Sequence, residues 1–191
     1  MAADSQLLES FLHRDHRVLG RRLPPLSLRR LMLLELVDSP WIAGGAVSWG
    51  SLILSVWACI RPWHGWTAPT TLQTLWLRLT SPRAKLAAES ARFETYVKDY
   101  WAPPQMWTKP RKKGENSKPS KLPWQMKVAG SLAAATGWEA DKIWNMPAGE
   151  ALWWAVSIAS YEGAEPDLIT DEERRMVERH KAMKREVVHY G

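Results

Sequence analysis

The sequence predicts an all-α protein. Apolar residues recur three and four positions apart in most segments, which is the spacing of one helical face, and capping residues stand before several of these segments. No segment alternates apolar and polar residues for long, so we expect no strands. A basic, Pro-rich stretch interrupts the helical pattern once. We therefore expect about eight helices in two lobes, residues 1–101 and 123–191, joined by a flexible linker at 102–122.

Five helices are expected in the N-terminal lobe. Ser27 and Ser48 are suited to cap the second and third, because a serine side chain accepts a hydrogen bond from the free N–H groups of a first turn. The second helix is apolar on nearly all sides, which predicts a central place in the core. In order, the helices cover residues 7–12, 28–37, 48–60, 72–79 and 82–100.

Three helices and one short helical turn are expected in the C-terminal lobe. Gly137 is suited to end the first helix in a left-handed conformation, and Pro147 to open the second. Thr170 and Glu173 form a capping box before the last, highly charged helix. In order, these segments cover residues 124–136, 140–144, 147–161 and 171–187.

Residues 41–60 carry no charged side chain and are long enough to cross a bilayer. Pro40, the Gly44–Gly45 pair and several serines interrupt this stretch, and its strongly apolar part, residues 52–60, is too short to cross. We interpret it as a buried core helix and keep a membrane span as the alternative.

Composition indicates a globular protein, with 46% apolar and 24% charged residues. The chain has 13 Trp against four Tyr and two Phe, and we expect most of these indoles in the core. It has one Cys and no apparent secretory signal at the N-terminus, which favours a reducing compartment and a soluble, cytoplasmic protein.

The net charge of +6 is concentrated in the linker. We interpret this basic strip as a solvated loop between the two lobes, and the alternative is phosphate contact, weak and non-specific rather than sequence-selective. The predicted phosphate contacts are Lys109, Arg111, Lys112, Lys113, Lys118 and Lys121.

The sequence lacks the common motifs of catalytic and cofactor-binding sites. The chain has no phosphate-binding Gly-rich loop and no Gly-x-Ser-x-Gly elbow. His13 and His16 have a metal-ligand spacing on a helix, but no third ligand stands near them. We therefore expect a non-enzymatic protein without cofactor or metal.

The expected partner is another protein, or a second copy of this chain. Trp153 falls among Glu150, Ser157 and Ser160 on the polar side of its predicted helix, where a large apolar side chain suggests an interface. Cover by a second layer of the same protein is the alternative. The predicted partner-binding residues are Trp144, Met146, Trp153, Met176 and Met183.

Two sequence pieces carry a resemblance to a known family. One is residues 18–28, VLGRRLPPLSL, followed by Leu33–Leu34–Glu35 and Ser39–Pro40; the other is residues 143–152, IWNMPAGEAL, followed by residues 168–173. The chain resembles the small helical tail assembly chaperones of tailed phages and prophages. That resemblance implies a non-enzymatic, mostly helical protein of the host cytoplasm that binds the tape measure or tail tube protein during assembly.

The leading hypothesis is thus an interaction protein, either a phage tail assembly chaperone or an accessory structural protein. A nucleic-acid-associated module that uses the basic linker is the second hypothesis. Membrane association through residues 41–60 is the third.

Overall fold

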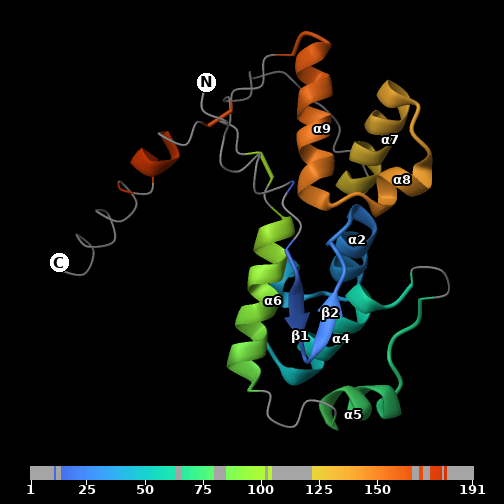
Figure 1. Ribbon diagram of the computed structural model, residues 1–191, viewed down its shortest axis with the longest axis vertical. Helices are drawn as coiled ribbons and strands as arrows, with labels where there is room; N and C mark the ends of the chain where they lie inside the picture. Colours follow the sequence, from blue (N-terminus) through green and yellow to red (C-terminus); the bar gives the residue numbers. More distant parts are fainter. Residues whose placement is uncertain are drawn as a thin grey trace.

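The computed structural model describes residues 11, 14–62, 66–79, 85–101, 103–104, 122–164, 168–169, 173–177 and 179. Within them the chain is mostly helical, as predicted, with one small sheet (Figure 1). The basic residues of the linker and most of the predicted first and last helices lie outside this part of the chain.

The sheet corrects the expectation that the chain has no strands. Strands β1 (His16–Val18) and β2 (Arg21–Leu23) pair antiparallel, with Arg17 opposite Arg22. Three residues are too few for an alternating pattern to be recognised. The two-residue turn has positive φ at both positions, 51° at Leu19 and 70° at Gly20, as tight hairpins require. A leucine rarely adopts this conformation. Here the buried Glu89 carboxylate accepts a hydrogen bond of 2.7 Å from the Leu19 N–H.

The helices follow the predicted order. They are α2 (Leu28–Leu36), α3 (Pro40–Ala43), α4 (Trp49–Ile60), α5 (Thr71–Leu79), α6 (Leu86–Tyr100), α7 (Trp124–Thr136), α8 (Ala140–Asn145) and α9 (Ala148–Tyr161). Three predicted caps are confirmed: Ser27 accepts from the Arg30 N–H, Ser48 forms a capping box with Ser51, and Gly137 has φ of 67°.

Residues 41–60 do not form one continuous helix. Gly44 and Gly45 have positive φ and separate the short α3 from α4. Seven of the twelve residues of α4 are buried, so the core-helix interpretation is confirmed for this part. No helix among the described residues has both the length and the apolarity needed to cross a membrane.

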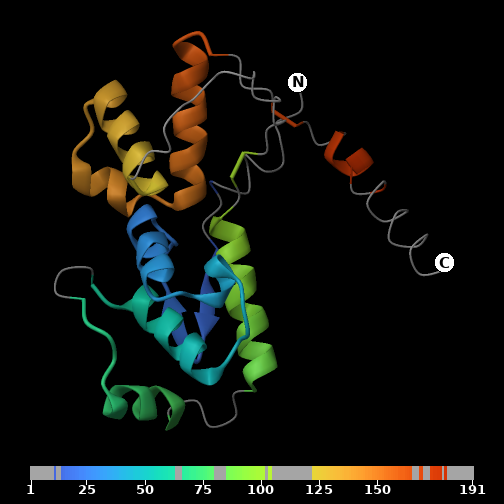
Figure 2. The same cartoon turned by 180° about the vertical axis from the view of Figure 1, so that it is seen from behind.

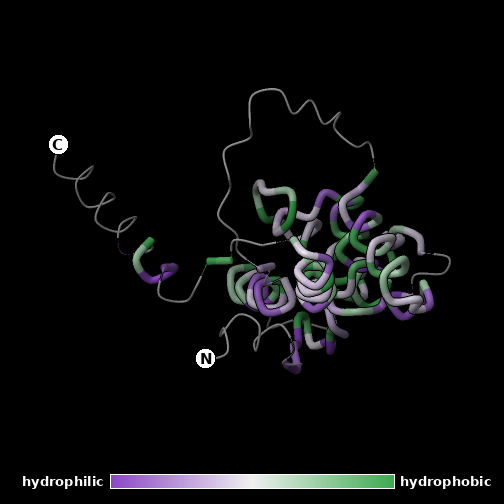
Figure 3. Tube along the Cα trace, turned by 90° about the horizontal axis from the view of Figure 1, so that it is seen from above, coloured by the Kyte–Doolittle hydropathy of each residue, from purple (hydrophilic) through white to green (hydrophobic). Residues whose placement is uncertain are grey.

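The core brings together residues from nearly all the helices. Leu28, Leu34, Leu52 and Leu132 are all fully buried in one cluster that includes both halves of the chain. Apolar and hydrophilic segments alternate along the packed helices, as expected where each helix buries one side (Figure 3).

An aromatic row on α6 packs against the hairpin. Tyr96 lies between Phe93 and Tyr100, with ring centroids 5.5 Å apart in each pair, and the His16 ring meets the edge of both tyrosines. The Tyr96 hydroxyl donates to the Pro24 carbonyl at 2.9 Å. Burial raises the pKa of the neighbouring Cys59 thiol to about 12.

The starts of α2 and α9 are joined directly. The Ala148 N–H donates to the Leu26 carbonyl at 2.8 Å, and the Leu28 N–H donates to the Met146 carbonyl at 3.2 Å. Arg29 of α2 also lies 3.1 Å from the Asp141 carboxylate of α8. These contacts link the two predicted lobes, and the division at 102–122 stays a prediction.

Candidate partner-binding surface

Helix α5 lies at one end of the molecule, opposite α7, α8 and α9 (Figures 1 and 2). Its start is fixed by a local pair of hydrogen bonds: the Thr70 N–H donates to Gln73 Oε1 at 2.9 Å, and the Gln73 N–H donates to Thr70 Oγ1 at 3.3 Å. The fully buried Leu77 anchors the helix to the core, and α5 packs on α4. The helix is therefore held in place although it is peripheral.

The opposite side of α5 exposes a continuous apolar stripe. Leu72, Leu75, Trp76 and Leu79 are 77%, 52%, 51% and 65% exposed. Their spacing of i, i+3, i+4 and i+7 places them on one helical face, the pattern that helices normally bury. We call these four residues the α5 face.

A groove runs between the α5 face and α4. Its volume is about 590 Å³, and its walls are Trp57, Arg61, Leu72, Gln73, Leu75, Trp76 and Leu79. The Trp57 indole N–H donates to the Thr67 carbonyl at 3.1 Å, which fixes the ring that forms one wall. The polar atom of this tryptophan is thus satisfied, and the groove is apolar at its base.

Three arginines near this surface lie over tryptophan rings. The guanidinium carbon of Arg61 is 4.2 Å from the Trp57 ring centroid, that of Arg78 is 3.7 Å from Trp49, and that of Arg21 is 4.3 Å from Trp76. Such stacking holds the charge in place and leaves guanidinium N–H groups for other acceptors.

Carboxylates are missing from the same region. Residues 39–88 contain no Asp or Glu, and no acidic side chain among the residues that the structure describes lines the groove. Within the described part of the chain, neither Arg61 nor Arg78 has an acidic partner. The α5 face is therefore an apolar surface with an uncompensated positive border.

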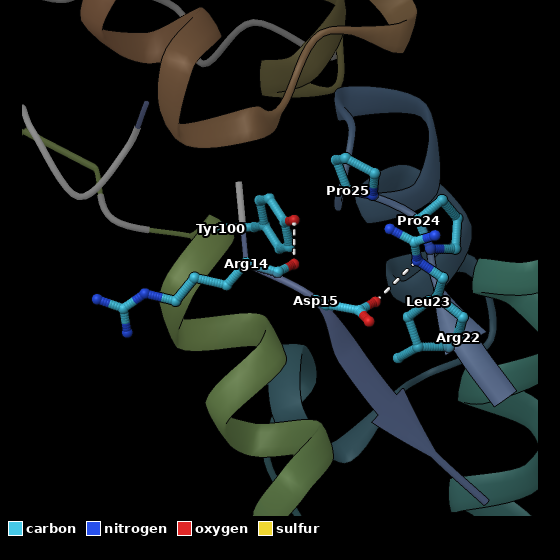
Figure 4. Close-up of a pocket in the computed structure, with 7 residues that line it drawn as sticks. All are labelled: Arg14, Asp15, Arg22, Leu23, Pro24, Pro25 and Tyr100. Carbon is cyan, nitrogen blue, oxygen red and sulfur yellow. Dashed lines mark hydrogen bonds and ion pairs between the residues drawn. The ribbon is translucent and has the colours of Figure 1, made fainter. Parts of the chain in front are cut away.

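A second hollow lies beside the hairpin and differs in character (Figure 4). Its volume is about 440 Å³, and it is lined by Arg14, Asp15, Arg22, Leu23, Pro24, Pro25 and Tyr100. Arg22 lies 2.8 Å from Asp15, and the Tyr100 hydroxyl donates to the Arg14 carbonyl at 3.0 Å. The Arg14 side chain points away from that ion pair (Figure 4) and lies 3.4 Å from Asp99. The polar groups of this hollow are thus bonded to one another.

Two side chains in this part of the molecule could carry acid–base or nucleophilic chemistry: Tyr100, which lines the hollow, and the buried Cys59, which does not. Burial and the nearby Asp99 charge raise the pKa of Tyr100, and burial raises that of Cys59, so both groups stay protonated near neutral pH. A protonated thiol is a poor nucleophile. No group of three metal-ligating side chains occurs among the residues that the structure describes.

A third, smaller hollow includes one predicted partner-binding residue. Trp144 lines it together with Arg29, Met32 and Met126, around a volume of about 200 Å³. Met126 is exposed, and methionines adapt readily to different apolar partners. Trp144 is half-buried against the core, and its role in partner binding stays a prediction.

Two other predicted residues are buried by the chain itself, and their contact with a partner stays a prediction. Met146 is 7% exposed because its backbone pairs with α2, which turns this segment into the core. Trp153 is 6% exposed, and α9 contacts α7, α2 and α6, so the chain itself covers more than one side of this helix. The neighbouring Trp154 is the exposed indole, packed edge-on against Trp138.

The remaining predicted residues divide into two groups. Met176 is exposed, in a short helical segment of residues 173–177. Met183 and the six basic side chains of the linker lie outside the described residues.

Sequence reasoning missed the α5 face as a site, although it predicted the helix. The signal was present, because Leu77 lies about 140° around the helix from Leu72. A nine-residue helix with apolar side chains on two faces indicates two contacts, and the core supplies one. Comparison with protein families, with curated proteins and with solved structures finds no match for this chain.

Proposed function

We propose that this protein is a non-enzymatic binding module whose main contact with its partner protein is the α5 face. The observation that supports this is the exposed stripe of Leu72, Leu75, Trp76 and Leu79, on a helix that the core already anchors through Leu77. Continuous apolar surface beside a groove is typical of protein-interaction sites.

We further propose that the partner is a phage tail component, the tape measure or tail tube protein, and that the chain acts as an assembly chaperone or accessory structural protein. This assignment rests on the sequence resemblance. The two pieces that carry it meet where Leu26 and Leu28 bond to Ala148 and Met146. They therefore describe one packing unit, which supports a resemblance in fold more than one in a binding site.

The test is capture of the partner from cells that carry the surrounding phage or prophage genes. The variant Leu75→Ser with Leu79→Ser changes two exposed side chains of the α5 face, and Leu36→Ser is a matched control, because Leu36 is 71% exposed on α2. We expect wild type and control to retain a tail protein that mass spectrometry identifies, and the double variant to lose most of it. Equal capture by all three proteins would exclude the α5 face as the contact.

The two-lobe arrangement with a basic linker remains part of this proposal. Proteolysis between Trp107 and Lys121 should leave two resistant pieces. We expect the pieces to stay associated, since Arg29 pairs with Asp141 and the Trp124 indole donates to Glu35 at 3.0 Å. Protection of the linker as strong as that of α2 would contradict the proposal.

A further inference from the structure

We propose that the groove beside the α5 face receives an amphipathic helix whose flanks are acidic. This inference rests on the proposed function, because it names the kind of segment that binds at the same surface. It follows from the shape of the groove, from the positions of two arginines and from the lack of an acidic partner for either of them among the described residues.

The shape favours a helix over a flat surface. The groove has walls from two elements, Trp57 and Arg61 from α4 and its border, and Leu72, Leu75 and Leu79 from α5. A helix laid in such a groove inserts side chains spaced i, i+3, i+4 and i+7, the usual form of helix-in-groove recognition. A lipid surface would contact the outermost side chains of α5 and leave the Trp57 wall unused.

The charge favours carboxylates at the edges of that helix. Arg61 and Arg78 lie on Trp57 and Trp49, and neither has an acidic partner in the described part of the chain. Guanidinium groups that stacking already orients lose little freedom when they bind a carboxylate. Charges at the border of an interface act mainly on specificity and association rate.

The same charges disfavour a second copy of this chain as the occupant. A symmetric contact through the α5 face would bring two sets of Arg61 and Arg78 onto one surface. Residues 39–88 of the second copy would supply no carboxylate to neutralise them. Like charges across an interface are unfavourable, so the acid must come from elsewhere.

The experiment uses the full chain and two synthetic helical peptides. Both peptides carry leucines at i, i+3, i+4 and i+7; one has glutamates along its flanks, and the other has lysines at the same positions. Binding is measured by fluorescence anisotropy at low and physiological salt. We expect micromolar binding of the glutamate peptide, at least about tenfold tighter than that of the lysine peptide, and a difference that shrinks as salt is added.

Charge reversal then tests the two arginines. Arg61→Glu with Arg78→Glu should remove the preference for the glutamate peptide or invert it, whereas Arg17→Glu, an exposed arginine on the hairpin, should preserve it. Arg61→Glu alone, at an exposed position, should reduce the preference by about threefold and guards against misfolding of the double variant. Circular dichroism and a melting curve accompany each variant.

Three outcomes would overturn the inference. They are equal affinity for the two peptides, no binding of the glutamate peptide below about 1 mM, and a charge reversal without effect. Tighter binding to vesicles of phosphatidylcholine with phosphatidylserine than to the peptide, lost on the same reversal, would assign the surface to lipid instead. The peptide experiments test which segment the groove binds. The proposed function is tested separately, and it fails if Leu75→Ser with Leu79→Ser leaves partner capture unchanged.

Discussion

Arginine and aromatic residues gather at two places, the corner where the β1–β2 hairpin packs on α6 and the surface around the α5 face. The two places differ in whether the chain itself supplies partners for these side chains. In the corner, Arg22 pairs with Asp15, and Glu89 pairs with Arg92 and the Leu19 N–H. On the α5 face the arginines lie on tryptophan rings, and four apolar side chains meet solvent. The charged groups of the corner are therefore paired within the chain. The α5 face, in contrast, exposes apolar area, and Arg61 and Arg78 beside it have no acidic partner among the described residues. This difference separates residues that hold the fold from residues that are available to a partner.

The largest effect on stability is expected at Trp153. The chain buries this side chain, although its place on the predicted helix suggested contact with a partner. Trp153→Ala removes a side chain that is 6% exposed and should lower the free energy of unfolding by roughly 3–5 kcal/mol. Trp154→Ala is the matched control, because Trp154 is 38% exposed and should cost about 1 kcal/mol. Urea unfolding of both variants measures this. Equal losses would return Trp153 to the candidate partner surface.

Glu89 tests whether the corner depends on its internal bonds. Glu89→Ala leaves the Leu19 N–H without its acceptor in a turn of positive φ, and we expect a loss of about 3 kcal/mol in the free energy of unfolding. Arg92→Ala removes only the more exposed partner of the same carboxylate and should cost less than about 1 kcal/mol. If the two variants are equally stable, the hairpin is held by the aromatic packing of α6 rather than by Glu89.

Cys59 gives the corner a pH dependence. Burial raises the pKa of its thiol from 9.0 to about 12 in the folded protein. Below pH 9 the thiol is protonated in both states and contributes no slope. Above pH 9 the unfolded chain releases the proton while the folded chain keeps it, so stability falls until the folded pKa is reached. The loss due to Cys59 should be about 2 kcal/mol at pH 10.5.

The measurement compares wild type with Cys59→Ala in urea at pH 8 and pH 10.5. Burial and the neighbouring Cys59 also raise the pKa of Tyr96, so the difference between the two slopes measures the thiol together with its coupling to Tyr96. Parallel slopes would mean that Cys59 is accessible to solvent in the folded state.

The helices could be predicted because their signals are local. Ser27, Ser48 and Gly137 mark helix ends through bonds within one turn, and the structure has all three as expected. The hairpin could not be predicted, because the partner that holds Leu19 is Glu89, 70 residues away in sequence. The burial of Trp153 could not be predicted for a related reason: periodicity gives the faces of α9, but not which other helices contact them. Only part of the candidate site could be predicted. The apolar stripe on α5 lies within one helix and follows from its spacing, whereas the groove also needs Trp57 of α4, whose position beside α5 depends on the tertiary structure.

The smallest effect on stability is expected on the α5 face, and it sharpens the comparison most. Leu72 is 77% exposed, and Leu77, five residues later on the same helix, is fully buried. Leu72→Ala should change the free energy of unfolding by less than about 0.5 kcal/mol, whereas Leu77→Ala, the matched control, should lose roughly 2–5 kcal/mol. The same chemical change on one helix thus distinguishes area that the chain buries from area that it leaves for a partner. A large loss for Leu72→Ala would mean that the chain already covers the α5 face in solution, and that the groove is not free to bind.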